Sequence, residues 1–352
     1  MTETDPQKIS AEGYPTVDFH THVLDPEVYA KTINHNVMTG FGTVPTGPRP
    51  EAGSSRAPIF ERMTDPHLHL SEMDERGVDV HVISTSTVSQ GTWWAEPRQA
   101  ADLDRAANEG IARWVKAHPQ RFVGTFTLPM QSLELALEEC EYAVGTLGLK
   151  VANLPANING LYLGDPQLRP LWTALDRLGV VVWIHPDGVK DQSFQKYFLW
   201  NGIGQPIEET RVIASLMYEG VLDAFPNVKI VISHGGGYLP HYMARLDRNA
   251  AGQPATRKNL TRMPSEYLKC LYYDTCVYAP SVLEDLIRYV GIDRIVLGSD
   301  YPVGDKDPFA VVRNCRALSK SDVETVTRRT PASILGLAAR PFAAATLAGV
   351  SS

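Results

Sequence analysis

The chain has 352 residues, 43% of them hydrophobic and 21% charged, which is enough apolar material for one large domain or two smaller ones. Its formal net charge of -7 comes without a long acidic or basic run, which argues against nucleic acid or an anionic membrane as the main partner. No apolar run approaches the roughly 20 residues of a membrane span, and the four cysteines lack a disulfide-scaffold spacing. We therefore expect a cytoplasmic protein that acts on a small molecule.

The first predicted element is a β-strand over residues 17–23, with the sequence VDFHTHV. Side chains alternate along a strand, so His20 and His22 point to the same side and can share a metal ion, whereas on a helix they would diverge. A His-x-His pair alone is weak evidence for a metal site. Residues 1–13 show no apolar periodicity before this strand, and we expect a flexible tail there.

A segment rich in glycine and proline covers residues 25–64 and is expected to form a long loop. Because it follows the candidate metal strand directly, we expect this loop to cover a substrate pocket as a lid. Asp65, followed by a proline, then predicts the start of a helix that ends at Gly77. His67 and His69 lie on this helix, where their side chains diverge, so we expect solvent-exposed or packing histidines.

From residue 78 onward the chain alternates between strand-like and helix-like segments. Strands are predicted at residues 78–84, 122–128, 149–154, 180–185, 228–234, 271–277 and 294–300. Helices are predicted at residues 97–117, 132–145, 166–178, 208–224, 238–249 and 280–290. With the first strand, this order predicts an α/β fold, one (β/α)8 TIM barrel over residues 14–340 with long catalytic-face loops, and a tail at 341–352. A doubly wound sheet is the alternative, but the first strand lacks the glycine-rich phosphate motif of such folds.

Further candidate ligands lie at the ends of three later strands, which is where a barrel carries its catalytic groups. His185 ends the fifth strand, His234 the sixth and Asp300 the eighth. Each alone is explained by packing, but four histidines and an aspartate at one rim are not, because buried polar groups need partners. Imidazole and carboxylate bind divalent cations, so the set predicts a metal site.

These residues resemble the pattern of the amidohydrolase superfamily, with a histidine pair on strand 1, single histidines after strands 5 and 6, and an aspartate after strand 8. Four further motifs are similar to its decarboxylase branch, which includes aminocarboxymuconate-semialdehyde decarboxylase and, more distantly, γ-resorcylate decarboxylase. The motifs are EMDERGVDV at 72–80, HGGG at 234–237, PSEY at 264–267 and LGSDYP at 297–302. The resemblance covers residues 16–335.

The resemblance implies a zinc-dependent, non-oxidative decarboxylase of an aromatic or ring-cleavage carboxylic acid. It implies one Zn²⁺ per subunit held by His20, His22, His185 and Asp300, with water completing the shell and another divalent metal such as Mn²⁺ as the alternative. Asp300 then serves as ligand and catalytic residue. His234 would lie near the water and act as acid/base, since zinc lowers the pKa of bound water and histidine moves protons near neutral pH.

The residues that would bind substrate follow the family pattern less closely. The family's loop arginine after strand 1 aligns with Ala57, so the adjacent Arg56 is the candidate for its role. Arg245 matches an arginine that reaches into the neighbouring subunit's pocket, which implies a homodimer, and a surface helix arginine is the alternative. Aromatic residues on predicted rim loops suit a flat acid, with dimer packing as the alternative. The candidates for contact with the substrate are Trp93, Phe194 and Trp200.

Some amidohydrolases carry a lysine after strand 4 that bridges two metals. Lys150 lies in the middle of the fourth predicted strand, and we favour a structural role for it. Two other functions stay open: a hydrolase that uses the same metal water against a lactone, amide or carbon–carbon bond, and a metal-binding barrel without turnover. The latter is disfavoured because His234 has no evident role in a purely structural site.

Overall fold

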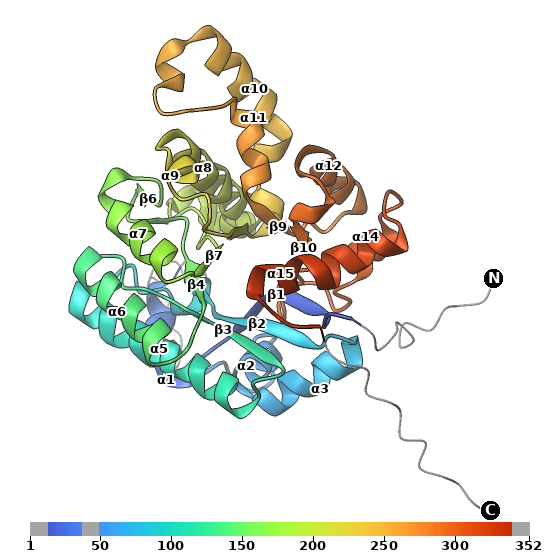
Figure 1. Ribbon diagram of the computed structural model, residues 1–352. Coiled ribbons are helices and arrows are strands. Elements are labelled where there is room, and N and C mark those ends of the chain that lie inside the picture. Colours follow the sequence, from blue (N-terminus) through green and yellow to red (C-terminus); the bar gives the residue numbers. More distant parts are fainter. Residues whose placement is uncertain (1–12, 37–48, 340–352) are drawn as a thin grey trace, which may run out of the picture.

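The computed structural model describes residues 13–36 and 49–339, so both predicted tails lie outside the described residues except for Gly13. The central feature is an eight-stranded parallel sheet in the order β1-β2-β3-β4-β7-β8-β9-β10 (Figure 1). Its strands are β1 (Val17–Val23), β2 (Val80–Thr85), β3 (Phe122–Phe126), β4 (Val151–Leu154), β7 (Val181–Ile184), β8 (Ile230–Ile232), β9 (Tyr272–Asp274) and β10 (Ile295–Val296). A short antiparallel hairpin of β5 (Asn157–Ile158) and β6 (Leu161–Tyr162) follows β4.

Helices alternate with the strands and surround the sheet, which confirms the predicted (β/α)8 barrel. They are α1 (Pro26–Thr32), α2 (Ala57–Thr64), α3 (Pro66–Arg76), α4 (Thr87–Gln90), α5 (Pro97–Ala117), α6 (Leu133–Gly145), α7 (Arg169–Arg177), α8 (Gln205–Tyr218), α9 (Val221–Ala224), α10 (Leu239–Gly252), α11 (Pro264–Tyr267), α12 (Pro280–Val290), α13 (Ala310–Asn314), α14 (Lys320–Glu324) and α15 (Thr330–Leu335). None of the described helices combines the length and apolar character that crossing a membrane requires.

The barrel closes where the chain after β10 returns to β1. Phe19 donates its backbone N–H to the carbonyl of Leu297 at 2.8 Å. Further along β1, Tyr301 accepts a backbone hydrogen bond from His22 at 2.8 Å and donates one to His20 at 3.2 Å. These bonds hold the first strand and the segment after the last strand side by side, so their side chains share one rim.

A bulge in β1 changes the direction of its side chains. Asp18 and Thr21 are three positions apart, yet they pair with residues of β2 that are only two positions apart. Phe19 and His20 are neighbours in sequence, and both contact Trp183, with ring centroids 6.3 and 5.0 Å away. Simple alternation would place these two on opposite faces. The bulge therefore brings an apolar core residue and a candidate ligand to the same interior.

The barrel interior is apolar near the amino ends of the strands and polar near their carboxyl ends. Its apolar layer is made of buried β-branched and aromatic side chains, packed against α15. The members are Val17, Phe19, Val80, Val82, Val151, Val181, Trp183, Val231, Val296 and, from α15, Ile334. A larger apolar layer lies between the strands and the surrounding helices. The candidate ligands therefore rest on a packed base.

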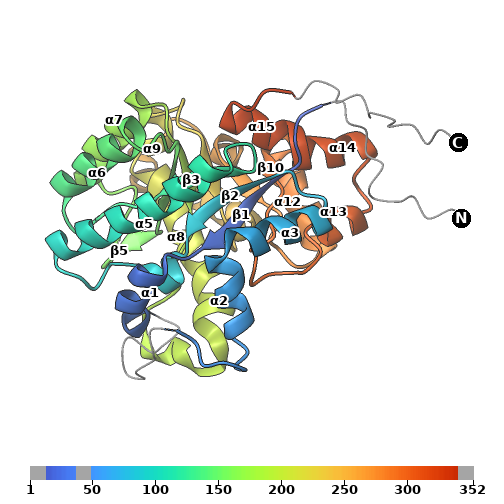
Figure 2. The ribbon, with the colours of Figure 1, turned by 90° about the horizontal axis from the view of Figure 1, so that it is seen from below.

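The segment 25–64 is not the continuous loop that its composition predicted. Within its described part, α1, a short 3-10 turn over residues 33–35, and α2 are helical. Asp25 starts α1 by accepting hydrogen bonds from the backbone N–H groups of Glu27 and Val28 at 3.0 and 3.2 Å. The prediction of a loop, which rested on the glycine and proline content, overlooked this capping residue. Residues 37–48 lie outside the described residues. Figure 2 shows α1 and α2 together on the lower side of the barrel.

The helix predicted after Asp65 is confirmed as α3. The Asp65 side chain accepts the backbone N–H of His67 at 2.8 Å, and Gly77 ends the helix with a φ of 70°. As predicted, the two histidines of this helix diverge. His67 is exposed, while His69 is buried with its Nε2 2.8 Å from Nδ1 of His81.

Gly298 lies where the last strand meets the first. A methyl group there would lie 2.7 Å from the Cβ of Asp274 and 2.9 Å from the Cβ of His20. We expect Gly298→Ala to lower the free energy of unfolding by about 1–3 kcal/mol, because the overpacked strands must move apart. Gly145→Ala at the end of α6 is the control, since nothing lies within 4 Å of its added methyl. Urea unfolding measures both, and equal stability of the two variants would contradict the prediction.

Candidate metal centre

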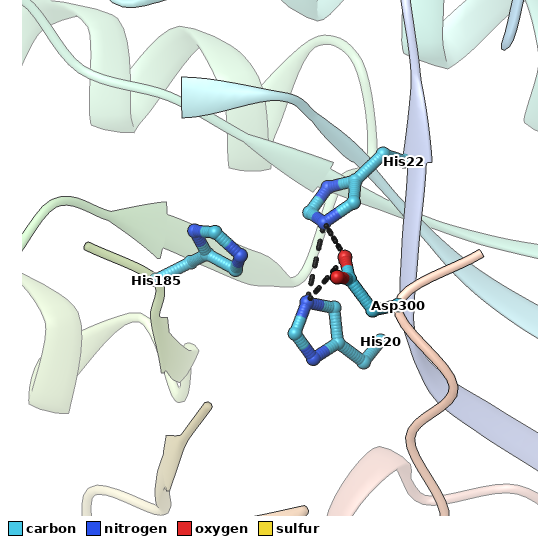
Figure 3. A group of neighbouring side chains, drawn as sticks. All are labelled: His20, His22, His185 and Asp300. Carbon is cyan, nitrogen blue, oxygen red and sulfur yellow. Dashed lines mark hydrogen bonds and ion pairs between the residues drawn. The ribbon is translucent and has the colours of Figure 1, made fainter. Parts of the chain in front are cut away.

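Four side chains meet at the carboxyl ends of β1 and β7 and in the segment after β10. They are His20, His22, His185 and Asp300, all buried, and their ligand atoms all lie within 4.8 Å of one another. Figure 3 shows the Asp300 carboxylate beside the rings of His20 and His22, and the ring of His185 across from these three side chains. The structure thus brings together the four residues that were predicted as metal ligands.

The ligand atoms lie at separations that suit a bound cation. Nε2 of His22 is 3.2 Å from Nε2 of His20 and 3.0 Å from Oδ1 of Asp300, and Nε2 of His20 is 3.3 Å from the same oxygen. Ligand atoms bonded to one ion at about 2.0–2.2 Å stand about this far apart. Three imidazole nitrogens and one carboxylate oxygen form a donor set that fits Zn²⁺ and also accepts other divalent metals.

Each histidine ligand is oriented by a contact from its other ring nitrogen, Nδ1. The pairs are His20 with Asp274 at 2.6 Å, His22 with Ser84 at 3.0 Å and His185 with Thr87 at 3.3 Å. Ser84 donates its own hydroxyl proton to the carbonyl of Thr21, so its oxygen accepts from Nδ1 of His22. This contact leaves the lone pair of Nε2 facing the centre, as metal binding requires.

Asp274 is a functional residue that the sequence analysis missed. It ends β9, is fully buried, and holds His20 through Oδ2. Its other oxygen, Oδ1, accepts the backbone N–H groups of Gly235 at 3.3 Å and Cys276 at 3.1 Å. A signal was available in the sequence, because Asp274 ends the seventh barrel strand. His185 and His234, at the ends of the fifth and sixth strands, had been chosen as candidates on the same ground.

The electrostatics of the centre favour a positive charge. Burial alone lowers the pKa of His20, but the charges of Asp274 and Asp300 outweigh it and raise the pKa to about 10. Burial also opposes the charge on Asp300, yet the adjacent His20 and His22 hold the pKa of that carboxyl well below its usual value. The two carboxylates thus create the negative potential that a cation site needs.

His234 lies beside the four ligands, directly after β8. Its ring centroid is 5.1 Å from that of His20 and 5.2 Å from that of His185. Nδ1 of His234 is 2.5 Å from Oε1 of Glu209, a fully buried residue of α8 that no sequence motif marked. Burial lowers the pKa of His234, but the carboxylate of Glu209 outweighs it and the pKa is raised. The contact engages Nδ1 and leaves Nε2 for a reacting group.

Gly237, three residues after His234, allows α8 to lie close to the turn that carries this histidine. A methyl group at Gly237 would overlap the carbonyl of Pro206 and lie 3.1 Å from the Cβ of Glu209. Its φ of 64° also disfavours other residues. His234 and Asp300 themselves have φ angles of 48° and 60°, in the left-handed region that non-glycine residues visit mainly at functional sites.

The predicted substrate contacts are distributed around the barrel rim. Trp200 is buried and packs with Phe194 against Val88, which belongs to α4 directly after β2. The Trp93 ring lies 4.2 Å from the ammonium of Lys190.

The two predicted arginines lie further out. Arg56 is exposed immediately before α2, and Arg245 is exposed on α10, which stands away from the barrel in Figure 1.

Lys150 does not lie in the middle of its strand, because β4 begins one residue later. Its side chain is exposed, and its carbonyl accepts a hydrogen bond from the backbone of Val181 at the amino end of β7. The candidate metal ligands lie at the opposite, carboxyl ends of the strands. The geometry is therefore consistent with a structural role for Lys150 and not with a role as a ligand that bridges two metals.

Several known proteins are similar to this chain in sequence or in fold. The chain matches the amidohydrolase family over residues 17–337. The 2-amino-3-carboxymuconate-6-semialdehyde decarboxylase of Dictyostelium discoideum is 32% identical over 278 residues, which cover 78% of this chain and 77% of that protein. The gamma-resorcylate decarboxylase of Polaromonas sp. is 29% identical over 304 residues, covering 81% and 90%. The dihydroxybenzoic acid decarboxylase of Polaromonas sp., solved with bound manganese and the inhibitor 2-nitroresorcinol, has a TM-score of 0.78 at 24% identity, covering 92% of this chain and 97% of that chain.

The contact between Asp274 and His20 predicts an effect on metal affinity. We expect Asp274→Asn to weaken divalent metal binding about 10- to 100-fold, because the amide orients the imidazole less firmly and removes a negative charge. Asp176→Asn, at an exposed position of α7, is the matched control. Competition with a chromophoric chelator measures both affinities, and unchanged affinity in Asp274→Asn would refute the assigned role.

Proposed function

Because the chain belongs to the amidohydrolase family, we propose that it is a metal-dependent decarboxylase that releases CO2 from an aromatic or ring-cleavage carboxylic acid without oxidation. One observation carries this proposal: His234 lies beside the group of four ligands, with its Nδ1 held by the buried Glu209. Its other ring nitrogen, Nε2, can therefore transfer a proton. The names of two relatives support the reaction class, since both are decarboxylases.

We assign one Zn²⁺ per chain to His20, His22, His185 and Asp300. Mn²⁺ is the competing assignment, because the donor set accepts it and a related structure was solved with manganese. When bound, a divalent cation acts as a Lewis acid that polarises substrate oxygens and stabilises the negative charge that develops during reaction. Metal analysis of the purified protein distinguishes the two ions.

Decarboxylation replaces a carboxylate by a proton, and His234 is the residue assigned to supply it. The proton moves from Nε2 to the carbon that bears the carboxylate. The bond to the carboxylate carbon then breaks, its electron pair returns to the ring or conjugated chain, and CO2 leaves. His234 takes up a new proton from solvent. Glu209 fixes the ring through Nδ1, and its negative charge stabilises the protonated imidazole before transfer.

The assigned substrate is a flat acid that packs against aromatic side chains at the rim. Trp200 and Phe194 offer ring surface beside α4, and Trp93 offers another. Arg56 is the candidate partner for a substrate carboxylate. We further assign a homodimer in which the exposed Arg245 reaches the partner's pocket, and the projection of α10 from the barrel supports this assignment (Figure 1).

The reaction is tested by product analysis. We expect the metal-loaded protein to release CO2 from an ortho-hydroxybenzoate or a carboxymuconate semialdehyde without net incorporation of water. Removal of the metal by a chelator should abolish release, and the metal should restore it. Absence of release from every such acid would argue against the decarboxylase. A product that gains oxygen from labelled water would instead indicate a hydrolase.

His234 is tested separately from the metal ligands. We expect His234→Ala to lower kcat by about 10²- to 10⁴-fold, because proton transfer is lost, while the metal content stays unchanged. His241→Ala on α10 is a matched control that should keep both. Loss of the metal from His234→Ala would identify His234 as a ligand and contradict the assignment.

A further inference from the structure

We propose that Cys276, together with His20 and His234, forms a second cation position that takes thiophilic divalent ions such as Cd²⁺. One ligand atom from each of the three residues lies within 4.8 Å of the other two. Two imidazoles and a thiol make a softer donor set than three imidazoles and a carboxylate. The structure therefore offers a cation two adjacent positions with different chemical preferences.

The position of Cys276 is fixed by the same carboxylate that orients His20. Cys276 lies two residues after Asp274, and its backbone N–H donates to Oδ1 of Asp274 at 3.1 Å. Oδ2 of that carboxylate is 2.6 Å from Nδ1 of His20. Cys276 is only 5% exposed. The backbone of Cys276 and the imidazole of His20 are thus both held by one buried residue.

A small hollow lies on one side of Cys276. The hollow has a volume of about 10 Å³, and neither His20 nor His234 lines it. Its lining includes Cys276, Thr275, Tyr278, Gly298 and Ser299. A volume near this size holds about one water molecule. Three protein ligands leave a tetrahedral ion with one open position, which a water molecule would fill.

The two positions are alternatives, because both use His20. An imidazole nitrogen binds one ion, and Nδ1 of His20 is already engaged by Asp274. A cation in the second position also occupies His234 and leaves three of the four first ligands unused. Binding displaces the thiol proton to solvent as the sulfur–metal bond forms, without oxidation. Mn²⁺, which prefers oxygen and nitrogen, would select the first position, whereas Cd²⁺ would be divided between the two.

Cadmium titration of the full-length, metal-free protein tests the site by absorption. We expect the ultraviolet sulfur-to-cadmium band to appear in the wild type and to be lost in Cys276→Ser, which should still bind one cadmium through the first position. Cys270→Ser is the matched control and should keep the band, since Cys270 precedes β9 at the other end of the barrel. A band that survives Cys276→Ser would overturn the proposal.

A second variant should shift bound cadmium from the first cation position toward the second. His185→Ala removes a ligand of the first position only, so the band per bound cadmium should increase. Absence of the band from both the wild type and His185→Ala would also overturn the proposal.

Inhibition by cadmium depends on the proposed function, whereas the absorption result does not. Cd²⁺ added to the Mn²⁺-loaded protein should inhibit CO2 release more strongly in the wild type than in Cys276→Ser, because it captures His234. Equal inhibition would contradict this consequence. A protein that shows the band but releases no CO2 from any acid would refute the decarboxylase and retain the second cation position.

Discussion

The contact of Asp274 with His20 is the interaction on which the rest of the centre depends. A buried carboxylate is costly unless it is paired, and Asp274 is satisfied by an imidazole and two backbone N–H groups from neighbouring segments. In return it fixes the ligand His20, the turn after His234 and the position of Cys276. One residue at the end of β9 therefore sets the relative placement of groups from β1, β8 and β9.

The grouping of these four side chains was predictable because barrel topology converts strand order into proximity. His20 and His22 lie 163 or more positions before His185, yet the carboxyl ends of parallel strands meet at one rim. Glu209 was not predictable in this way, since nothing local distinguishes it from other acidic residues of a helix, whereas Asp274 carried the same signal as the other strand ends and was overlooked. Only the folded chain shows that each meets a histidine. The helices within 25–64 were missed because glycine and proline outweighed the cap at Asp25.

The bulge in β1 shows where a correct prediction rested on an incomplete reason. Alternation correctly places His20 and His22 on one face, but it would turn Phe19 away from them. The structure instead brings Phe19 and His20 to the same Trp183. The inserted residue lets a single strand of seven residues serve both the apolar base and the polar centre above it.

The Nδ1 contacts of the three candidate histidine ligands have a consequence for how the geometry of the centre is set. Each imidazole is oriented by the protein itself, through Asp274, Ser84 or Thr87. A zinc finger, in contrast, folds only as its metal binds. In this barrel, hydrogen bonds within the protein orient the three imidazoles, so the fold itself contributes to the geometry of the centre. Substitution of Asp274, Ser84 or Thr87 would therefore alter the orientation of an imidazole without removing a ligand atom.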